Sequence, residues 1–330
     1  MSHTSVNRFI KEFSNQKVLI IGDAMIDAYM WGQIDRMSPE APIPVVDVLK
    51  REKRLGGAAN VALNLKALGT DPVLLTLVGG DRKGEEFMDL MKSSNLSIEG
   101  VIVDENRKTT QKTRIIAQDK HVLRVDEEDV YDFEDTNEVL NTIQRLHSKI
   151  GFDVVVFEDY NKGLLTEDII TACIGFCKDN HIKTIVDPKK KNFFAYKHVD
   201  IFKPNLKEIT EGLGVECHAD SESDLIKTCM LLTEKIHAES IFLTLSEYGV
   251  FILNKDGQTT HPAFDRKIID VSGAGDTVVS VASLALACGL SNSDLALISN
   301  LAGGLVCESV GVVPIQKDLL ISEIKKTYGL

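Results

Sequence analysis

The stretch DVSGAGDTVVS, residues 270–280, joins a glycine-rich turn to an apolar run. Gly273, Ala274 and Gly275 leave backbone N–H groups uncovered just where the small apolar residues that follow predict a buried helix. The N-terminus of such a helix is a typical binding site for an anion such as phosphate. The next residue, Asp276, is itself an anion. The same pattern also fits an ordinary helix start, because short glycine motifs alone are weak evidence.

Short apolar runs that end in glycine or polar residues recur along the chain and predict buried parallel strands. The first is KVLIIGD, residues 17–23. The others are DPVLLTLVGGD (71–81), DVVVFED (153–159), IKTIVDPK (182–189), VDIFKPN (199–205) and SIFLTLSEYGV (240–250). Helix-like stretches separate most of them. This alternation predicts an α/β fold with a mainly parallel central sheet flanked by helices, and a site along the carboxyl ends of the strands.

Two stretches break this alternation and predict a small β-structure that stands off the main sheet. PVVDVL, residues 44–49, follows a proline-rich segment, and residues 111–129 alternate apolar and polar positions around the turn-like QDK. We expect a small β lid or an oligomer contact, formed by segments of about 28–50 and 104–126. No repeat or linker divides the chain, so residues 1–330 are expected to form one domain.

Composition excludes some classes of protein. The formal net charge of −12 over 330 residues argues against a nucleic-acid partner. The six cysteines form no CxxC pair, which favours reduced, buried thiols over a metal site or disulfides. The N-terminus lacks the apolar run of a signal peptide, and no segment has the length of a membrane span, so a cytoplasmic location without membrane contact is expected.

Polar residues near the first predicted strand suit a sugar. GDAMID places Asp23 and Asp27 after that strand, where carboxylates could accept hydrogen bonds from hydroxyl groups, although a solvated turn is the alternative. LGGAAN adds Gly56 and Gly57, where a backbone can approach a ligand closely, and Asn60, which can both donate and accept. Tight helix packing is the alternative for these three residues.

KPNLKE, residues 203–208, has two possible interpretations. Asn205 and Glu208 have the spacing of a capping box at a helix start, which is the ordinary interpretation. Alternatively, Glu208 holds the water shell of Mg²⁺, because this ion keeps its waters and takes only one or two carboxylates.

Cations cluster near the same expected edge of the sheet. Solvated surface charge is the ordinary interpretation, and binding of phosphate is the alternative. The cations are Lys162 and Lys189 to Lys191 at strand ends, Lys112, Arg114 and Arg124 in the hairpin, and Arg36 near the proline-rich segment.

Taken in order, these motifs resemble the ribokinase/PfkB superfamily of carbohydrate kinases. GDAMID, GGAAN, KPNLKE and DVSGAGDT are similar to its signature regions, and the resemblance covers nearly all of the chain. SPEAPIPVV, RLGGAANVALNLKALG and DYNKG are most similar to the D-glycero-D-manno-heptose 7-phosphate kinases of lipopolysaccharide core synthesis. Those kinases are often fused to a nucleotidyltransferase that makes ADP-heptose and carries an HxGH motif. None of the eight histidines forms that motif, so the chain is expected to be the kinase half as a separate protein.

The resemblance implies a ribokinase-like fold and a role for each matched position. Asp276 matches the catalytic base, and residues 273–275 match the anion hole. ATP with Mg²⁺ is implied at Asn205, Glu208, Thr244, Ser246, Gly249 and Asn300. The sugar is implied at Asp27, Gly56, Gly57 and Asn60, with Asp23 as a neighbour. Asp270 and the carbonyl of Ser272 could hold a monovalent cation such as K⁺.

Three residues depart from the pattern of the resembling subgroup. Lys190 stands where a glycine tends to follow DPK, and Glu308 and Val312 stand where lysine and threonine are expected. These departures affect the expected shape of the adenine pocket and leave the reaction unchanged.

The implied reaction is ATP-dependent phosphorylation of the anomeric hydroxyl of heptose 7-phosphate to the 1,7-bisphosphate. The substrate's own phosphate requires cations, for which Lys112, Arg114, Arg124 and Lys162 are the candidates. One alternative is a kinase of the same superfamily for another sugar, sugar phosphate or nucleoside. A second is a non-catalytic sugar-binding protein, against which Asp276 and Glu208 argue. A Rossmann dehydrogenase would carry its glycine loop after the first strand. Exposed lid edges often pair, so a homodimer is expected.

Overall fold

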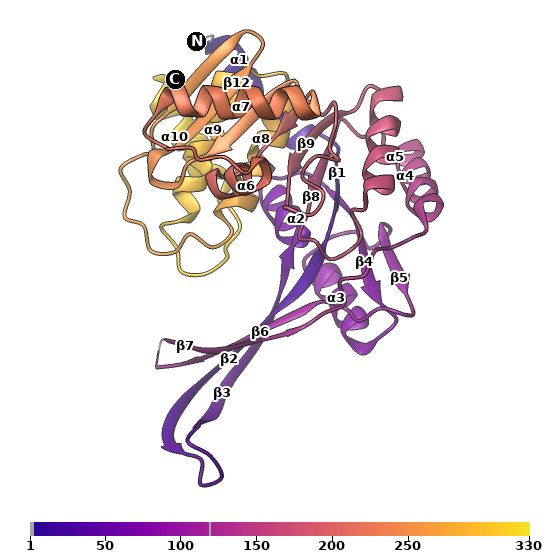
Figure 1. Ribbon diagram of the computed structural model, residues 1–330, viewed down its shortest axis with the longest axis vertical. Helices are drawn as coiled ribbons and strands as arrows, with labels where there is room; N and C mark the ends of the chain where they lie inside the picture. The colour runs from indigo at the N-terminus through magenta and orange to yellow at the C-terminus, as the bar shows by residue number, and fades with distance from the viewer. Residues whose placement is uncertain (1–2, 119) are drawn as a thin grey trace.

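A computed structural model describes residues 3–118 and 120–330 and contains two sheets (Figure 1). The main sheet has nine strands in the order β13-β12-β11-β10-β9-β8-β1-β4-β5. All neighbours from β11 to β5 pair in parallel, and only β12 and β13 join antiparallel at one edge. The bounds are β1 Val18–Gly22, β4 Val73–Gly79, β5 Val101–Asp104, β8 Val154–Glu158, β9 Lys183–Asp187, β10 Ile201–Phe202, β11 Ser240–Thr244, β12 Val250–Asn254 and β13 Gly257–His261. This confirms the predicted mainly parallel sheet.

Alternate residues of the central strands face two separate apolar cores. In β1, Val18 and Ile20 belong to one core, and Leu19 and Ile21 belong to the other. All four are fully buried, because helices cover both faces of the sheet. A strand buried on both faces is an unbroken apolar run, which is why KVLIIGD could be recognised as one.

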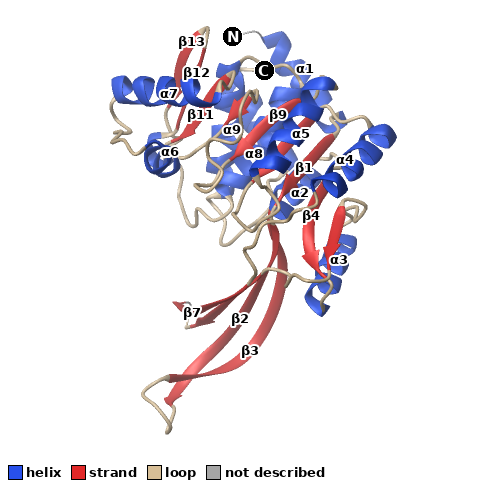
Figure 2. Ribbon diagram, turned by 45° about the vertical axis from the view of Figure 1, so that its right-hand side comes forward, coloured by secondary structure: helices blue, strands red, loops and turns tan. Residues whose placement is uncertain are grey.

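Ten α-helices of the described chain cover the two faces of the main sheet (Figure 2). On one side lie α1 His3–Glu12, α2 Ala58–Ala67, α3 Arg82–Ser93, α8 Ala274–Ala287, α9 Asn292–Val306 and α10 Lys317–Tyr328. On the other side lie α4 Thr136–Ile150, α5 Glu167–Asp179, α6 Leu206–Leu213 and α7 Glu222–Ile236. Short 3-10 turns occur at Phe13–Asn15 and Ser246–Tyr248. None of these helices is long and apolar enough to cross a membrane.

The second sheet projects away from the body of the molecule (Figures 1 and 2). Its order is β3-β2-β6-β7, with bounds β2 Ala24–Met37, β3 Pro44–Gly57, β6 Gln111–Ala117 and β7 Lys120–Glu127. The near end is anchored in the core, where Ile26 and Leu55 are buried, whereas Met37 at the far end is 55% exposed. We call these four strands the projecting sheet.

The boundaries of the projecting sheet differ from those expected. Its first two strands start earlier and end later than residues 28–50, because their bases continue into the core. The second segment begins at Gln111 and not near 104, because β5 ends there as an edge strand of the main sheet. The hairpin expected over 111–129 is present as β6 and β7. Asp119 of the predicted QDK turn, like Met1 and Ser2, lies outside the described residues.

All six cysteines are free thiols, and five of them are buried. Burial raises the pKa of the Cys177 thiol to about 12, so it stays protonated near neutral pH. The buried and reduced thiols expected from the sequence are therefore present.

Candidate active site

The N-terminus of α8 differs from most helix starts of the chain because no side chain caps it. In α3, α4, α5, α6, α7 and α9 the N-cap side chain accepts a backbone N–H. At α8 the N-cap is Gly273, with φ 79°, where a Cβ atom would lie 3.0 Å from Val312 and 3.1 Å from the side-chain nitrogen of Asn60. This close approach, together with the positive φ, explains the glycine.

One of the three amides that the sequence suggests for anion binding at the start of α8 is not free. The amide of Ala274 donates to the carbonyl of Val271 at 3.2 Å, so it is already occupied. Among the described residues, no acceptor is found for the amides of Gly275 and Asp276, which belong to the first helical turn. Gly275 is exposed, and a Cβ atom there would touch only Asp187, at 3.9 Å. No acceptor is found in the described chain for the amide of Gly273 either, so the amides of Gly273, Gly275 and Asp276 are the donors available to an anion.

Asp276 lies in the first turn of α8, and its carboxylate accepts two hydrogen bonds from neutral donors. Asn60 Nδ2 donates to Oδ2 at 2.6 Å, and the hydroxyl of Tyr160 donates to Oδ1 at 3.1 Å. Burial raises the pKa of Asp276 to about 6, although both hydrogen bonds lower it. A carboxyl group with a pKa near neutrality is well suited to accept a proton in a reaction at pH 7.

The positions that the sequence assigns to a sugar gather beside Asp276. Asn60 starts α2 and is 2% exposed, and its Oδ1 has no partner within the described structure. Gly56 and Gly57 end β3, and Gly57 has φ 58°. Asp27 of β2 forms an ion pair with Arg114 of β6. Asn60 is therefore the one member of this group with a buried acceptor still open for a ligand hydroxyl.

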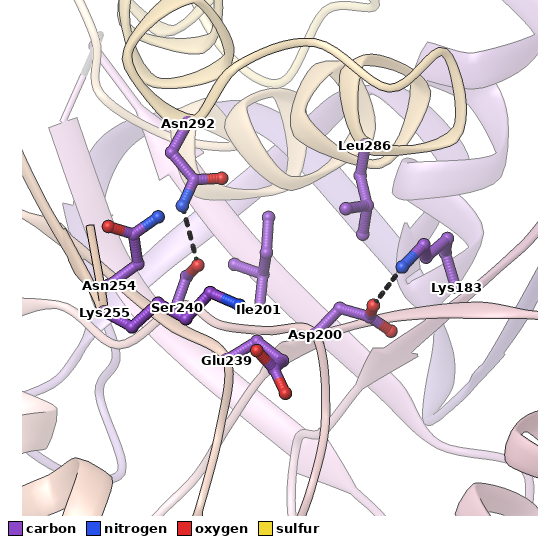
Figure 3. A pocket seen from close by; sticks show the side chains of 9 residues that line it. All are labelled: Lys183, Asp200, Ile201, Glu239, Ser240, Asn254, Lys255, Leu286 and Asn292. Carbon is purple, nitrogen blue, oxygen red and sulfur yellow. Dashed lines mark hydrogen bonds and ion pairs between the residues drawn. The ribbon is translucent and has the colours of Figure 1, made fainter.

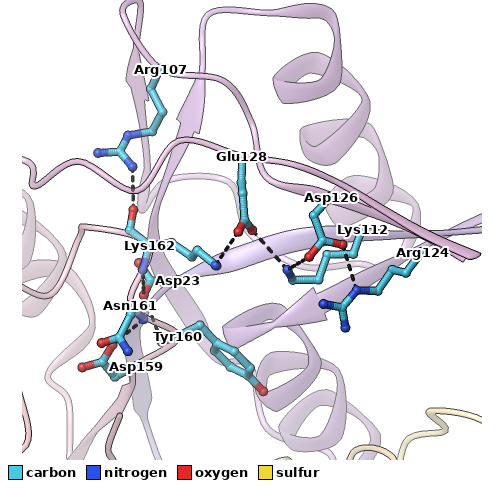
Figure 4. A network of polar contacts seen from close by, with 10 residues as sticks. All are labelled: Asp23, Arg107, Lys112, Arg124, Asp126, Glu128, Asp159, Tyr160, Asn161 and Lys162. Carbon is cyan, nitrogen blue, oxygen red and sulfur yellow. Dashed lines mark hydrogen bonds and ion pairs between the residues drawn. The ribbon is translucent and has the colours of Figure 1, made fainter. Parts of the chain in front are cut away.

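Asp23 has a different environment from the other candidates. Its carboxylate accepts the backbone amides of Tyr160 and Lys162, at 3.0 and 2.9 Å (Figure 4), and that of Leu164, at 3.3 Å. The side chain is buried, and burial raises its pKa while these amides lower it. The residue thus organises the loop that follows β8, and we do not include it among the proposed sugar ligands.

Charged residues that the sequence analysis did not select lie at the carboxyl ends of β8, β9 and β10. Asp187 ends β9 and pairs with Lys203 at 2.8 Å and with Lys189 at 3.7 Å. Lys203 is 2% exposed, and Asp187 is 5% exposed. The two lysines keep the pKa of Asp187 below its usual value in spite of burial. Asp187 lies beside Gly275, so this pair contributes to the electrostatic environment at the start of α8.

Glu158 at the end of β8 is the least compensated charge of the site. It is fully buried, it aligns with Asp187 in the β8–β9 register, and neither carboxyl oxygen has a hydrogen-bond partner among the described residues. Burial, followed by the charges of Asp187 and Asp276, raises the pKa of Glu158 well above its usual range. Burial and the two neighbouring carboxylates thus disfavour the charged form of Glu158.

The KPNLKE segment forms the capping box expected from its spacing. Asn205 caps α6 by accepting the amide of Glu208 at 2.8 Å, and Glu208 Oε2 accepts the amide of Asn205 at 2.9 Å. The remaining oxygen of Glu208 binds Lys189 at 2.5 Å. Lys189 is 31% exposed at its side chain, so Oε1 can exchange this partner for a water of a bound Mg²⁺. The capping role and a metal role are compatible.

The other positions assigned to ATP lie farther along the same edge. Thr244 ends β11 and bridges to Asn205, and Ser246 begins the next turn. Gly249 closes this turn with φ 88°, where a Cβ atom would collide with the backbone carbonyl of His261. Asn300 of α9 donates to the carbonyl of Pro262 at 2.8 Å. Gly249 and Asn300 thus have structural contacts of their own.

The three departures from the resembling subgroup lie in different surroundings. Lys190 is exposed, and Glu308 pairs with Arg266 at 3.2 Å. Val312 packs toward Gly273, next to the turn that starts α8. Only Val312 touches the candidate anion site.

The four candidate phosphate cations are all paired with carboxylates: Arg114 with Asp27, and the other three as Figure 4 shows. Glu128 binds Lys112 at 3.1 Å and Lys162 at 2.8 Å, so it joins β6 to the loop after β8. Asp126 binds Lys112 and Arg124, both at 2.9 Å. Arg124 is 60% exposed at its side chain, whereas Lys112 and Lys162 are 14% and 17% exposed. Lys112, Lys162 and Arg114 are therefore the enclosed cations of this group.

The candidate site for a monovalent cation borders the α8 turn. Asp270 accepts the amides of Ser272 and Gly311, both at 2.9 Å. These bonds hold residues 270–273 against the loop before α10. The carboxylate retains further lone pairs, because an ionised carboxylate offers about four acceptor positions.

Cavities occur both at this site and away from it. One of about 370 Å³ is lined by Asp27, Asn60, Tyr29 and Arg54, among others, and thus adjoins the sugar positions. Another, of about 330 Å³, lies at the amino ends of β9 to β11 and is lined by Lys183, Asp200, Ser240 and Asn292, among others (Figure 3). The second lies at the opposite ends of the strands from Asp276.

Sequence reasoning missed Tyr160, Glu158, Asp187 and Lys203. Glu158 and Asp187 could have been found, because both end apolar runs at the expected edge of the sheet. Lys203 directly precedes the Pro-Asn of KPNLKE, but no feature of the nearby sequence indicates that this lysine is buried. The contact of Tyr160 with Asp276 joins residues 116 positions apart and has no signature in one sequence.

Comparisons with known proteins agree with this geometry. A family model described as pfkB family carbohydrate kinase matches residues 15–318. The Bifunctional protein HldE of Syntrophotalea carbinolica is 36% identical over 312 residues, which cover 94% of this chain and 63% of that protein. The Bifunctional protein HldE of Helicobacter pylori is 37% identical over 298 residues, covering 90% of this chain and 64% of that protein. The chain thus spans less than two thirds of the length of these relatives.

Solved structures share the fold. Phosphofructokinase-2 from Escherichia coli, in a crystal structure in complex with potassium, gives a TM-score of 0.79 at 17% identity and covers 95% of this chain and 99% of its own. Ribokinase from Thermotoga maritima gives a TM-score of 0.67 at 16% identity, covering 94% and 99%. The ribokinase-like fold is therefore confirmed. From the family match over residues 15–318, we conclude that this chain belongs to the pfkB family of carbohydrate kinases.

Proposed function

We propose that this kinase transfers a phosphoryl group from ATP to the anomeric hydroxyl of D-glycero-D-manno-heptose 7-phosphate, giving the 1,7-bisphosphate used in ADP-heptose and lipopolysaccharide core synthesis. Support comes from the relatives named HldE and from the resemblance of residues 38–46 and 159–163 to heptose kinases. The observation that carries the choice of a phosphorylated sugar is the group of enclosed cations, Lys112, Lys162 and Arg114.

The proposed reaction depends on groups that are already oriented. The sugar hydroxyl binds between Asn60 Oδ1 and Asp276. Asp276 accepts its proton as the new P–O bond forms and the bond from the γ-phosphorus to the leaving ADP breaks. The amides of Gly275 and Asp276 face the transferring group, whose transition state is loose and spreads charge over its oxygens. Fixed donors at that point stabilise this charge without reorganising during the reaction. Asp27 and the backbone at Gly56 and Gly57 line the sugar.

Cations complete the proposed nucleotide site. Glu208 would hold Mg²⁺ through water, and the ion supplies neutralising charge to the phosphate oxygens. Asp270 and the carbonyl of Ser272 would hold K⁺ beside the α8 turn. Thr244, Ser246 and Gly249 border the nucleotide, and Asn300 adjoins the adenine end.

The substrate phosphate is proposed to bind Lys112, Lys162 and Arg114, with Arg124 at the rim. In the ligand-free structure three carboxylates, Asp27, Asp126 and Glu128, pair with these four cations. The group therefore has one positive charge in excess, and a phosphate dianion would compete with Glu128 for the two lysines. Exchange of carboxylate for phosphate retains charge-assisted hydrogen bonds on both lysines.

A coupled ADP-release assay with Mg·ATP tests the substrate. Heptose 7-phosphate, fructose 6-phosphate, ribose and adenosine are compared, and unphosphorylated heptose is the matched control. We expect the highest kcat/KM with heptose 7-phosphate, and a Lys112→Met variant should raise KM for it by about tenfold, the effect of one charge-assisted hydrogen bond. Activity confined to one of the last three panel members would overturn the choice of heptose.

We also propose a homodimer through the projecting sheet. Leu123 and Val125 of β7 are 57% and 41% exposed, and their spacing by two places them on one face of the sheet. Unpaired strand edges with exposed apolar residues favour association. Light scattering coupled to size exclusion should give twice the mass of the chain, and a Leu123→Lys variant should give the single mass. A monomeric wild type would contradict the dimer.

A further inference from the structure

Tyr160 makes a direct contact with Asp276 that the proposed function does not use. Its hydroxyl donates to Oδ1, whereas Asn60 donates to Oδ2, so each carboxyl oxygen receives one donor. Two donors from different segments, one on α2 and one on the loop after β8, fix the plane of the carboxylate. An ionised carboxylate has about four acceptor positions, so at least one remains on each oxygen for a ligand hydroxyl.

The loop that carries Tyr160 is held by several independent contacts. Asp23 accepts the amides of residues 160, 162 and 164, and Arg107 donates to the carbonyl of Lys162 at 2.6 Å (Figure 4). On the ring itself, the Nζ atom of Lys189 lies 5.5 Å from the centroid. The position of the hydroxyl is thus determined by the fold.

Charged groups from several elements surround the carboxyl group that Tyr160 contacts. Glu158 ends β8, Asp187 ends β9, Lys189 follows β9, and Lys203 precedes α6. Asp187 disfavours the charged form of Asp276, Lys203 favours it, and the neutral donors Asn60 and Tyr160 favour it as well. A phenol donating to a carboxylate forms a charge-assisted hydrogen bond, which is stronger than a neutral one.

We propose that Tyr160 is a positioning residue for phosphoryl transfer, which orients the Asp276 carboxylate and keeps it in the proton-accepting state. The proposal rests on the proposed function in taking Asp276 as the base. Tyr160 acts through Asp276 and need not touch the substrate. Its loss should therefore change the pH dependence of the reaction more than the affinity for ATP.

The test compares Tyr160→Phe with Tyr196→Phe. Both variants lose one tyrosine hydroxyl that bonds an aspartate, but Tyr196 donates to Asp159, at 2.8 Å, and not to Asp276. For Tyr160→Phe we expect the acid limb of kcat/KM for the sugar to move up by about one pH unit, the effect of one hydrogen bond to a charged group. Activity at pH 6 then falls by up to about tenfold, whereas activity at pH 8.5 stays within about twofold.

For Tyr196→Phe we expect an unchanged acid limb. An equal loss of activity at all pH values in Tyr160→Phe, or the same shift in both variants, would overturn the proposal.

A second measurement works without turnover. Carbon-13 NMR of labelled aspartate follows the titration of Asp276 in the ligand-free protein, with Asp276→Asn identifying the signal. Tyr160→Phe should raise this titration midpoint, and Tyr196→Phe should not. If no sugar is phosphorylated, the proposed function fails, while this titration still decides whether Tyr160 controls the state of Asp276. An unmoved midpoint would overturn the proposal whatever the activity.

Discussion

The N-termini of α6 and α8 both lie at the edge of the main sheet formed by the carboxyl ends of its strands. A side chain caps α6 and none caps α8, so we call them the closed and the open helix end. At α6, Asn205 and Glu208 satisfy each other's backbone amides in a capping box. At α8, Gly273 provides no side chain, and the amides of Gly275 and Asp276 find no acceptor among the described residues. A capping side chain satisfies free amides of a helix N-terminus, whereas uncapped amides can bind an anionic ligand.

The two helix ends share one group of buried charges. Asp187 lies beside Gly275 of α8, and Lys189 links Asp187 to Glu208 of α6. Lys203 compensates the charge of Asp187 through an ion pair at 2.8 Å. At the N-terminus of α8, these ion pairs therefore balance the local charges, and no capping side chain contributes.

The largest expected effect comes from breaking this charge pairing. Lys203→Met removes the closest partner of Asp187 and leaves a buried carboxylate with only the longer contact to Lys189. Loss of one partner of a buried pair should lower the free energy of unfolding by about 3 kcal/mol. Urea denaturation measures it, with the exposed Lys190→Met as the control. A loss below about 1 kcal/mol would show that Lys203 is not needed to compensate Asp187.

The open turn itself should be sensitive at Gly273. Gly273→Ala places a Cβ atom at a positive φ and against Val312, which should cost about 1–2 kcal/mol of stability. Gly275→Ala is the matched control, because it lies inside the helix with nothing closer than 3.9 Å. Thermal unfolding compares the two variants. Equal stability would mean that the turn does not require its left-handed conformation.

The pH dependence of activity should reflect the ionisation of Asp276 in the first turn of α8. Asp276 has a pKa of about 6, raised by burial, and only its ionised form accepts a proton. Activity should therefore be constant above pH 7 and fall by about tenfold per unit well below pH 6. A series of kcat/KM measurements from pH 5 to 8.5 checks this. An acid limb near pH 4 would indicate that the base is a carboxylate with an ordinary pKa.

The smallest expected effect is a loss of stability on removing the N-cap of α6. Asn205→Ala removes the N-cap of α6 and should cost about 1 kcal/mol of stability, whereas Asn205→Asp keeps an acceptor and should cost less. Denaturation of both variants provides the measurement. A loss of activity in Asn205→Ala far beyond the loss of folded protein would show that Asn205 also binds the nucleotide.

Much of the fold could be predicted from the sequence, because its signals are local. Apolar runs such as residues 17–23 become strands buried on both faces, and KPNLKE becomes a capping box. The bounds of the projecting sheet were predicted less well. β5 pairs with the main sheet and β6 with the projecting sheet, and no change in composition between them marks this difference. Asp276 and Asn60 could be selected from the sequence by their own chemistry; the structure places them in contact, and their roles stay predictions. The contact of Tyr160 with Asp276 could not be predicted, because it joins distant residues, and Asp23 binds backbone amides.

The most direct measurement is the rate of ADP release with heptose 7-phosphate at saturating Mg·ATP, for the wild type and Asp276→Asn. Asp179→Asn, an exposed aspartate at the end of α5, is the control. If Asp276 at the open end of α8 is the base, its replacement should lower kcat by about 10²–10⁴-fold while ATP binding by calorimetry is unchanged. A variant that retains turnover close to the wild type would contradict the central claim.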